Sequence, residues 1–261
     1  THEDKRKALV TATKPDGKLF SLISREWIDH PLNYRRAGLL RALCLFAPRQ
    51  IGCELPTLFA DQVKEVSWEL PSAFADSLRW RNKPEEFGSS PKELWNLWEM
   101  WCEKSSTSAE LDELLALSLI PEHPFEMGKV LHPWLLNQES PGSRDASWTI
   151  HVIPLSLSET SVVSVVVRWA TEACLEGIRK EIALPAAQAL AWLTATSQQG
   201  MREKAMQGLT RLLVACPEVV NEFLPDFLTV NDAYVVESVL IATMGMVTDG
   251  HSQDAATFAA Q

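Results

Sequence analysis

Residues 229-TVNDAYVVESVLIATMGMV-247 open with two adjacent polar residues and continue with nearly four helical turns of mainly apolar side chains. Asn231 and Asp232 are favourable N-cap residues, because their side-chain oxygens can accept hydrogen bonds from the first free amides of a helix. We therefore predict a helix over 232–248 with Asn231 and Asp232 as its caps. A helix that is apolar on most sides belongs between other helices.

The segment 197-SQQGMREKAMQGLTRLL-213 has the same design 34 residues earlier. In both segments a capping residue precedes the first anchoring apolar residue by four positions, and further anchors follow at helical spacing. The corresponding pairs are Ser197 and Asn231, Met201 and Val235, Glu203 and Glu237, Ala205 and Val239, and Leu212 and Met246. A period near 34 in a helical chain is typical of stacked helix pairs. The pattern predicts an all-α fold, an α-solenoid of the HEAT or TPR kind, with little or no β-structure.

Helical spacing recurs along most of the remaining chain, with Pro and short polar turns between the units. The predicted helices span 34–48, 91–104, 109–120, 128–138, 183–196, 199–216 and 218–228. Residues 139–144 are predicted to form a loop, and 145–152 fit either a helix or a short strand.

The segment 158-SETSVVSVVVRWATEACLEG-177 combines two conflicting signals. Its valines favour a strand, whereas its apolar residues keep helical spacing. We predict a helix that Ser158 or Thr160 caps and that Gly177 ends.

The organisation of the chain follows from the uniform helical pattern. We expect residues 1–261 to form a single helical-repeat segment, with a sub-boundary near 139–143. Because position 1 is Thr and not Met, we expect this segment to belong to a longer chain.

Charge and composition restrict the function. The chain is 46% hydrophobic and 22% charged, with a net charge of −10, and it has no apolar run long enough to span a bilayer. Residues 1–57 carry ten Lys and Arg against six Asp and Glu, whereas residues 58–179 carry ten against nineteen. Nucleic acid and membrane are therefore not expected partners. An acidic surface can attract a basic protein, although a solvated face explains the same charge.

The five cysteines form no CxxC pair, which favours free, buried thiols in the cytoplasm. They are Cys44, Cys53, Cys102, Cys174 and Cys216.

No catalytic, cofactor-binding or metal-binding pattern is found. The Gly-Lys in 12-ATKPDGKLFS-21 lacks the first glycine and the Ser or Thr of a phosphate-binding loop. HExxH, GxSxG and paired CxxC motifs are absent. His132 and His151 lie among apolar residues, and we expect them to be hydrogen-bonded core or boundary groups. A ligand or metal site at the Asn231–Asp232 pair is the alternative to capping. We predict no cofactor and no enzymatic activity for this segment.

Ten tryptophans are many for this length. Trp and Arg are frequent anchors of protein interfaces, so Trp80 and Arg81 are the predicted partner-binding residues. The stripe of Trp95, Trp98 and Trp101 is a second interface candidate. Core packing is the alternative for all of these tryptophans.

Four phrases, taken in order, resemble the helical C-terminal region of bacterial antiviral STAND NTPases of the Avs family. They are 72-SAFADSLRWRN-82, 143-SRDASWTIHV-152, 190-LAWLTATSQQGMREKAMQGLTRLL-213 and 230-VNDAYVVESVLIATMG-245, and the resemblance covers about residues 35–248. It implies that this chain is a sensor segment that binds a viral protein. The ATPase core, which oligomerises, and the effector would lie outside it. A cytosolic helical-repeat scaffold for host proteins is the alternative, and a helical enzyme is a third class.

Overall fold

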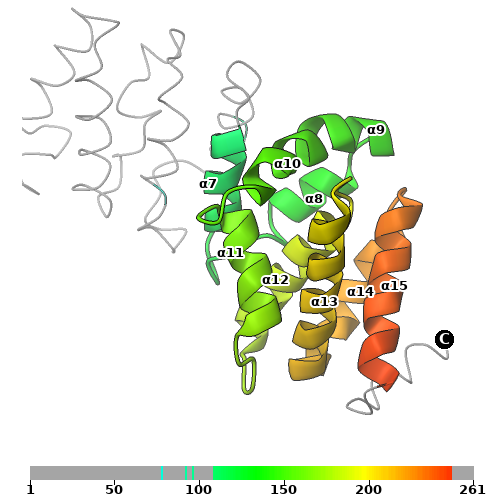
Figure 1. The fold of residues 1–261 in the computed structure, drawn as a ribbon. Coiled ribbons are helices and arrows are strands. Elements are labelled where there is room, and N and C mark those ends of the chain that lie inside the picture. The colour runs from blue at the N-terminus through cyan, green and yellow to red at the C-terminus, as the bar shows by residue number, and fades with distance from the viewer. Residues whose placement is uncertain (1–77, 79–91, 93–95, 97–107, 249–261) are drawn as a thin grey trace, which may run out of the picture. The chain divides into compact units, whose positions relative to one another are not determined.

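The computed structural model describes residues 78, 92, 96 and 108–248 (Figure 1). The chain divides into two compact units, Thr1–Glu110 and Leu111–Gln261. Residues 139–143, where the sequence suggests a sub-boundary, lie inside the second unit. Trp80, Arg81, the Trp95/Trp98/Trp101 stripe, the predicted helix over 34–48, and all of the helix over 91–104 except Lys92 and Asn96 lie outside the described residues.

Within residues 108–248 every regular element is helical and no residue lies in a strand. The all-α prediction is therefore confirmed for this part of the chain, including the valine-rich 162–167. The elements are α7 (Ser108–Ser118), α8 (Leu131–Leu136), α9 (Pro141–Arg144), the π-helical η2 (Asp145–Thr149), α10 (Ile150–Ser156), α11 (Val162–Glu172), α12 (Lys180–Leu193), α13 (Gln199–Ala215), the 3₁₀ turn η3 (Pro217–Val219), α14 (Val220–Leu228) and α15 (Ala233–Thr248).

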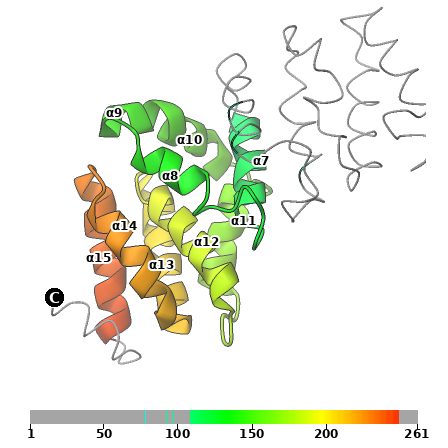
Figure 2. The ribbon, with the colours of Figure 1, turned by 180° about the vertical axis from the view of Figure 1, so that it is seen from behind.

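The five C-terminal helices form two layers. Helices α11, α13 and α15 lie side by side, and we call them the outer layer (Figure 1). Helices α12 and α14 form a second layer behind it, as the reverse view shows (Figure 2). Helices α8, α9 and α10 lie across one end of the two layers.

The 34-residue period reappears as a repeated pattern of burial. The buried positions of α13 and α15 correspond as Ala205 and Val239, Gly208 and Ala242, Leu209 and Thr243, and Leu212 and Met246. The same offset relates α12 to α14, through Ala186 and Val220, Ala189 and Phe223, Leu190 and Leu224, and Leu193 and Phe227. The pairs α12–α13 and α14–α15 thus bury equivalent faces, as the sequence period predicts.

Two glycines allow the outer layer to pack closely. A Cβ atom at Gly208 of α13 would lie 2.8 Å from the Cβ of Ala170 in α11. A Cβ atom at Gly245 of α15 would lie 2.8 Å from Thr210 Cγ2 in α13. Both separations are shorter than van der Waals contact, so each interface of the layer depends on the absence of one side chain.

Helix α11 is fixed at both ends by side chains. Ser161 caps it by accepting a hydrogen bond from the Ser164 amide, and Asp112 of α7 accepts one from the Val162 amide at 2.7 Å. At the other end, Arg211 of α13 donates to the carbonyls of Ala170 and Ala173. These bonds satisfy groups that have no partner within the helix.

The predicted ends of α11 were wrong. The cap is Ser161, not Ser158 or Thr160, because Ser161 directly precedes the helix, has an extended backbone and accepts from the Ser164 amide. The helix ends at Glu172. Gly177 adopts a φ of 70° in the following turn, where glycine is favoured, but it does not end the helix.

The predicted loop at 139–144 was also wrong. Ser140 caps a short helix, α9, which continues through η2 into α10, so the segment that fitted either helix or strand is helical. Pro141 occupies the first helical position, where a missing N–H costs nothing. Helix α8 is shorter than the predicted 128–138, and Pro133 lies in its first turn, where proline is tolerated.

Candidate functional site

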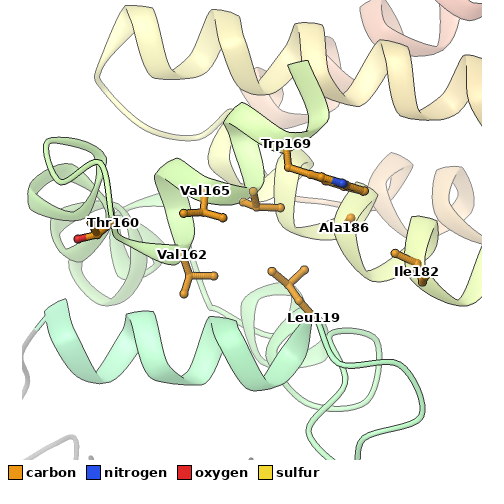
Figure 3. A pocket seen from close by; sticks show the side chains of 8 residues that line it. Leu119, Thr160, Val162, Val165, Trp169, Ile182 and Ala186 are labelled. Atoms are coloured by element: carbon orange, nitrogen blue, oxygen red, sulfur yellow. The ribbon is translucent and has the colours of Figure 1, made fainter. Parts of the chain in front are cut away.

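An apolar groove of about 280 Å³ lies between α11, the start of α12 and the residue that follows α7 (Figure 3). Its walls carry aliphatic side chains and one indole, and no titratable group lines it. The lining residues are Leu119, Thr160, Val162, Val165, Val166, Trp169, Ile182 and Ala186. Such a groove can hold an apolar side chain, but it offers no acid, base or nucleophile for catalysis.

The position of the groove follows from the orientation of α11. Val163, Val167 and Ala170 face the core and are buried. The neighbouring positions Val162 and Val165 are thereby turned toward the groove, and 42% of the surface of Val165 is exposed.

A stripe of large apolar side chains is exposed along α15. We define the α15 stripe as Tyr234, Leu240, Ile241 and Met244, of which Tyr234 is 73% and Met244 65% exposed. At the 34-residue offset Met244 corresponds to Thr210 of α13, the residue that lies beneath Gly245. Met244 is therefore equivalent to a residue of α13 on which α15 packs.

A second hollow, of about 570 Å³, lies between the α10–α11 loop, α11 and α13. It is more polar than the apolar groove and displays both signs of charge, through Glu159, Arg168, Glu172 and Lys204. This mixture offers hydrogen bonds to a partner without selecting one sign of charge.

The end of the layers beside α8 and α9 contains a buried polar cluster centred on Trp192 of α12. Arg144 is 1% exposed, and its guanidinium carbon lies 5.0 Å from the centre of the Trp192 ring. The guanidinium donates to the Leu135 carbonyl, to Asn231 Oδ1 at 2.5 Å and to Asp232 Oδ2 at 3.4 Å. Burial lowers the pKa of Arg144, and the carboxylates of Asp232 and Asp145 oppose that shift.

The other side of Trp192 holds His132 and Trp148. The indole N–H of Trp192 donates to His132 Nδ1 at 2.8 Å, and its backbone carbonyl accepts from the Trp148 indole at 3.0 Å. His132 Nε2 lies 3.4 Å from Asp226 Oδ2, and Phe227 stacks beside the imidazole. We call these residues, with Arg144, Asn231 and Asp232, the Trp192 cluster.

The structure assigns different roles to Asn231 and Asp232. Asp232 Oδ1 accepts from the Tyr234 amide in the first turn of α15, which is the geometry of an N-cap. Asn231 caps no amide. Its side chain accepts from Arg144 and donates to the carbonyls of Gln138 and Glu139, so the expectation of a double cap was wrong for Asn231. The group bound by the pair is thus Arg144 of the same chain.

Three of the four sequence phrases described above, the second, third and fourth, meet in this cluster. Arg144 and Trp148 come from the second phrase, Trp192 from the third, and Asn231 and Asp232 from the fourth. Sequence reasoning missed the contact between Arg144 and Trp192, and separately it missed the apolar groove. The order of the phrases along the chain was the only sequence signal that linked these residues. The hydrogen bonds that join the phrases connect residues 44 to 88 positions apart, which no local pattern reveals.

The histidine and cysteine expectations had mixed outcomes. His132 is a hydrogen-bonded core group, as predicted. Cys216 is a buried free thiol, and burial together with Glu218 raises its pKa to about 11. Cys174 is free but exposed, contrary to prediction, because it lies beyond the end of α11.

Among the described residues, no group of three or more His, Cys, Asp and Glu side chains has an arrangement that could hold a metal ion. The helices described also include none with the length and apolar character needed to cross a bilayer.

Comparison of the chain with protein-family models, with curated proteins and with solved structures finds no match.

Proposed function

We propose that this chain is a protein-binding α-solenoid segment that serves as the viral-protein sensor of an antiviral STAND NTPase. The observation that carries the proposal is the exposed apolar surface of a layered helical fold, at the apolar groove and along the α15 stripe. Contiguous exposed apolar patches are unusual on a surface that has no partner, and they mark sites of association. Aliphatic walls suit the burial of a side chain of another protein.

The layered arrangement supports the solenoid part of the proposal. Two consecutive helix pairs bury equivalent faces at a 34-residue period, and a regular stack presents one helix of each pair on a continuous surface. The outer layer would be that surface, since it carries the valines of α11, the mixed-charge hollow and the α15 stripe.

The sensor part of the proposal rests on the resemblance. Its phrases contribute the buried residues of the Trp192 cluster, which define the scaffold and not the contact surface. Specificity for one viral protein would therefore depend on exposed side chains such as Val165 and Met244. Because the chain is acidic after residue 57, the partner should present basic patches, and association should slow as salt increases.

The test is direct binding of individually expressed phage proteins to the purified chain, followed by variants of the groove and the stripe. We expect one folded phage protein to bind. Val165→Asp and Met244→Asp should each weaken that binding at least about tenfold, because each places a charge in a buried apolar contact. Both sites are exposed in the free chain, so the melting temperature should change little.

The exposed Glu203→Ala on α13 is the matched control, and it should bind like the original chain. Binding that neither Val165→Asp nor Met244→Asp affects would reject both surfaces. Binding of host proteins in the absence of any phage partner would favour the cytosolic scaffold.

A further inference from the structure

His132 has a hydrogen-bonding arrangement that admits one protonation state. An indole N–H can only donate, so His132 Nδ1, 2.8 Å from Trp192 Nε1, must carry no proton. The proton of the neutral ring therefore lies on Nε2, which faces Asp226 Oδ2 at 3.4 Å. Both ring nitrogens then have partners, in a site where the side chain is only 2% exposed.

The surroundings of His132 disfavour a second proton. From α14 the ring faces the carboxylate of Asp226, whose side chain is half exposed, and the aromatic ring of Phe227. From α12 it faces the indole of Trp192, and the permanent cation Arg144 lies over that same indole. Helix α8 itself contains no other titratable residue. A proton on Nδ1 would oppose the Trp192 N–H with a second donor and would add a second cation beside one indole.

We propose that His132 is an acid-sensitive lock, which holds α8 to α12 and α14 when neutral and releases them when its Nδ1 is protonated. Protonation must break the bond to Trp192 Nε1, because two N–H groups cannot share it. Trp192 also binds Trp148 through its carbonyl and supports Arg144 with its ring. A displacement of Trp192 therefore reaches the α9–α10 segment and, through Arg144, the start of α15.

The electrostatics give the direction of the pH effect. Burial lowers the pKa of His132 below 6.5, and the charge and hydrogen bond of Asp226 oppose this only in part. Between the folded-state pKa of His132 and about pH 6.5, the unfolded chain binds a proton at His132 that the folded chain does not bind. The contribution of His132 to stability is thus complete above that pH and is lost as pH falls toward the folded-state pKa.

The experiment compares the full chain with His132→Asn between pH 7.5 and 5.0. The Asn oxygen can replace Nδ1 as the acceptor for Trp192, but it does not titrate in this range. For the original chain the unfolding equilibrium constant should rise by up to about tenfold per pH unit below 6.5, relative to the variant. The Trp192 indole N–H resonance, identified by its loss in Trp192→Phe, should shift with pH in the original chain and stay constant in His132→Asn.

Asp226→Asn supplies a second measurement that does not depend on the folding of His132→Asn. Removal of the carboxylate leaves burial unopposed, so the transition of the Trp192 resonance should move to lower pH than in the original chain. The proposal would be overturned if the free energy of unfolding changed with pH in the same way in the original chain and in His132→Asn. It would also be overturned by a Trp192 resonance that does not shift with pH, or by one that titrates identically in the original chain and Asp226→Asn.

Discussion

The outer layer and the Trp192 cluster stabilise the same helices by different means. In the outer layer α11, α13 and α15 approach closely because Gly208 and Gly245 leave no Cβ atom at the contact points. In the Trp192 cluster, buried side chains from α8, α9 and α12 bond to one another and to the less buried Asn231 and Asp232 before α15. The outer layer should therefore be sensitive to added volume, and the cluster to the loss of a single polar partner.

The largest effect is expected for Arg144→Ala. The change removes a buried cation, leaves the Asp232 carboxylate with the Tyr234 amide but without its cationic partner, and opens space beside Trp192. Loss of one partner of a buried ion pair typically costs 3–5 kcal/mol. Because Asp232 keeps some solvent contact, we expect a loss of about 3 kcal/mol in the free energy of unfolding, measured by urea titration.

Arg168→Ala, at an exposed position of α11, is the control and should change stability by no more than about 0.5 kcal/mol. Equal effects of the two Arg variants would contradict a polar origin of stability in the cluster.

Gly208→Ala tests the outer layer. The new methyl group would lie 2.8 Å from Ala170 Cβ, which cannot rotate away, so α11 and α13 must separate. Overpacking costs about 1–3 kcal/mol, whereas the helix propensity of Ala returns about 1 kcal/mol. We expect a net loss of up to about 2 kcal/mol in thermal or urea unfolding.

Gly200→Ala, in the first turn of α13 with no atom within 4 Å of the added Cβ, is the matched control. It should be neutral or stabilising by up to about 1 kcal/mol. If Gly208→Ala also stabilised the chain, close approach would not be what holds the outer layer together.

Arg211→Met tests the hydrogen bonds by which Arg211 joins α13 to the end of α11 in the outer layer. It removes two hydrogen bonds to the carbonyls of Ala170 and Ala173 at the C-terminus of α11, but it keeps an apolar side chain of similar length. The expected loss is about 1–2 kcal/mol, since both acceptors can turn to water. Because Ala170 also contacts Gly208, combination with Gly208→Ala should cost less than the sum, and additive losses would show that the two contacts are independent.

The last prediction concerns alkaline pH. The pKa of Cys216 is raised from 9.0 to about 11, first by burial and then by Glu218. Its contribution to stability should be complete below pH 9 and should be lost as pH rises toward 11, because only the unfolded chain releases the proton. Cys216→Ala should lose stability less steeply than the original chain over this range, and identical slopes would contradict the assignment.

The sequence predicted elements that depend on local pattern. The bounds of α13 and α15 were recovered almost to the residue, because a polar start and regular apolar spacing mark them. The valine-rich 162–167 is helical as predicted, since Val163, Val166 and Val167 fall on one buried face and this packing outweighs their strand propensity. At Pro141 the local pattern indicated a loop, although a first helical turn accommodates proline.

Long-range polar contacts could not be predicted. Asn231 looks like a cap from its neighbours alone, but its partner Arg144 lies 87 residues away. His132 was recognised as a hydrogen-bonded core group because apolar residues surround it, whereas nothing near it in sequence identified Trp192 or Asp226. The apolar groove could not be predicted for the same reason. Its walls come from separate segments of the chain, and their distance in space depends on how the helices pack.

The π-helical turn η2 has a consequence for insertions and deletions. Segments α9, η2 and α10 are continuous, so Asp145–Thr149 acts as a helix with one residue more than an α-helix of the same path. Deletion of one residue here would restore ordinary α-helical winding and would leave α10 in its present phase relative to α9, so Val152 and Leu155 would stay buried. A deletion within α10 itself would instead rotate the residues that follow it by about 100°. The η2 turn is therefore the place in this segment where one residue can be lost without turning the buried face of α10 away from the core.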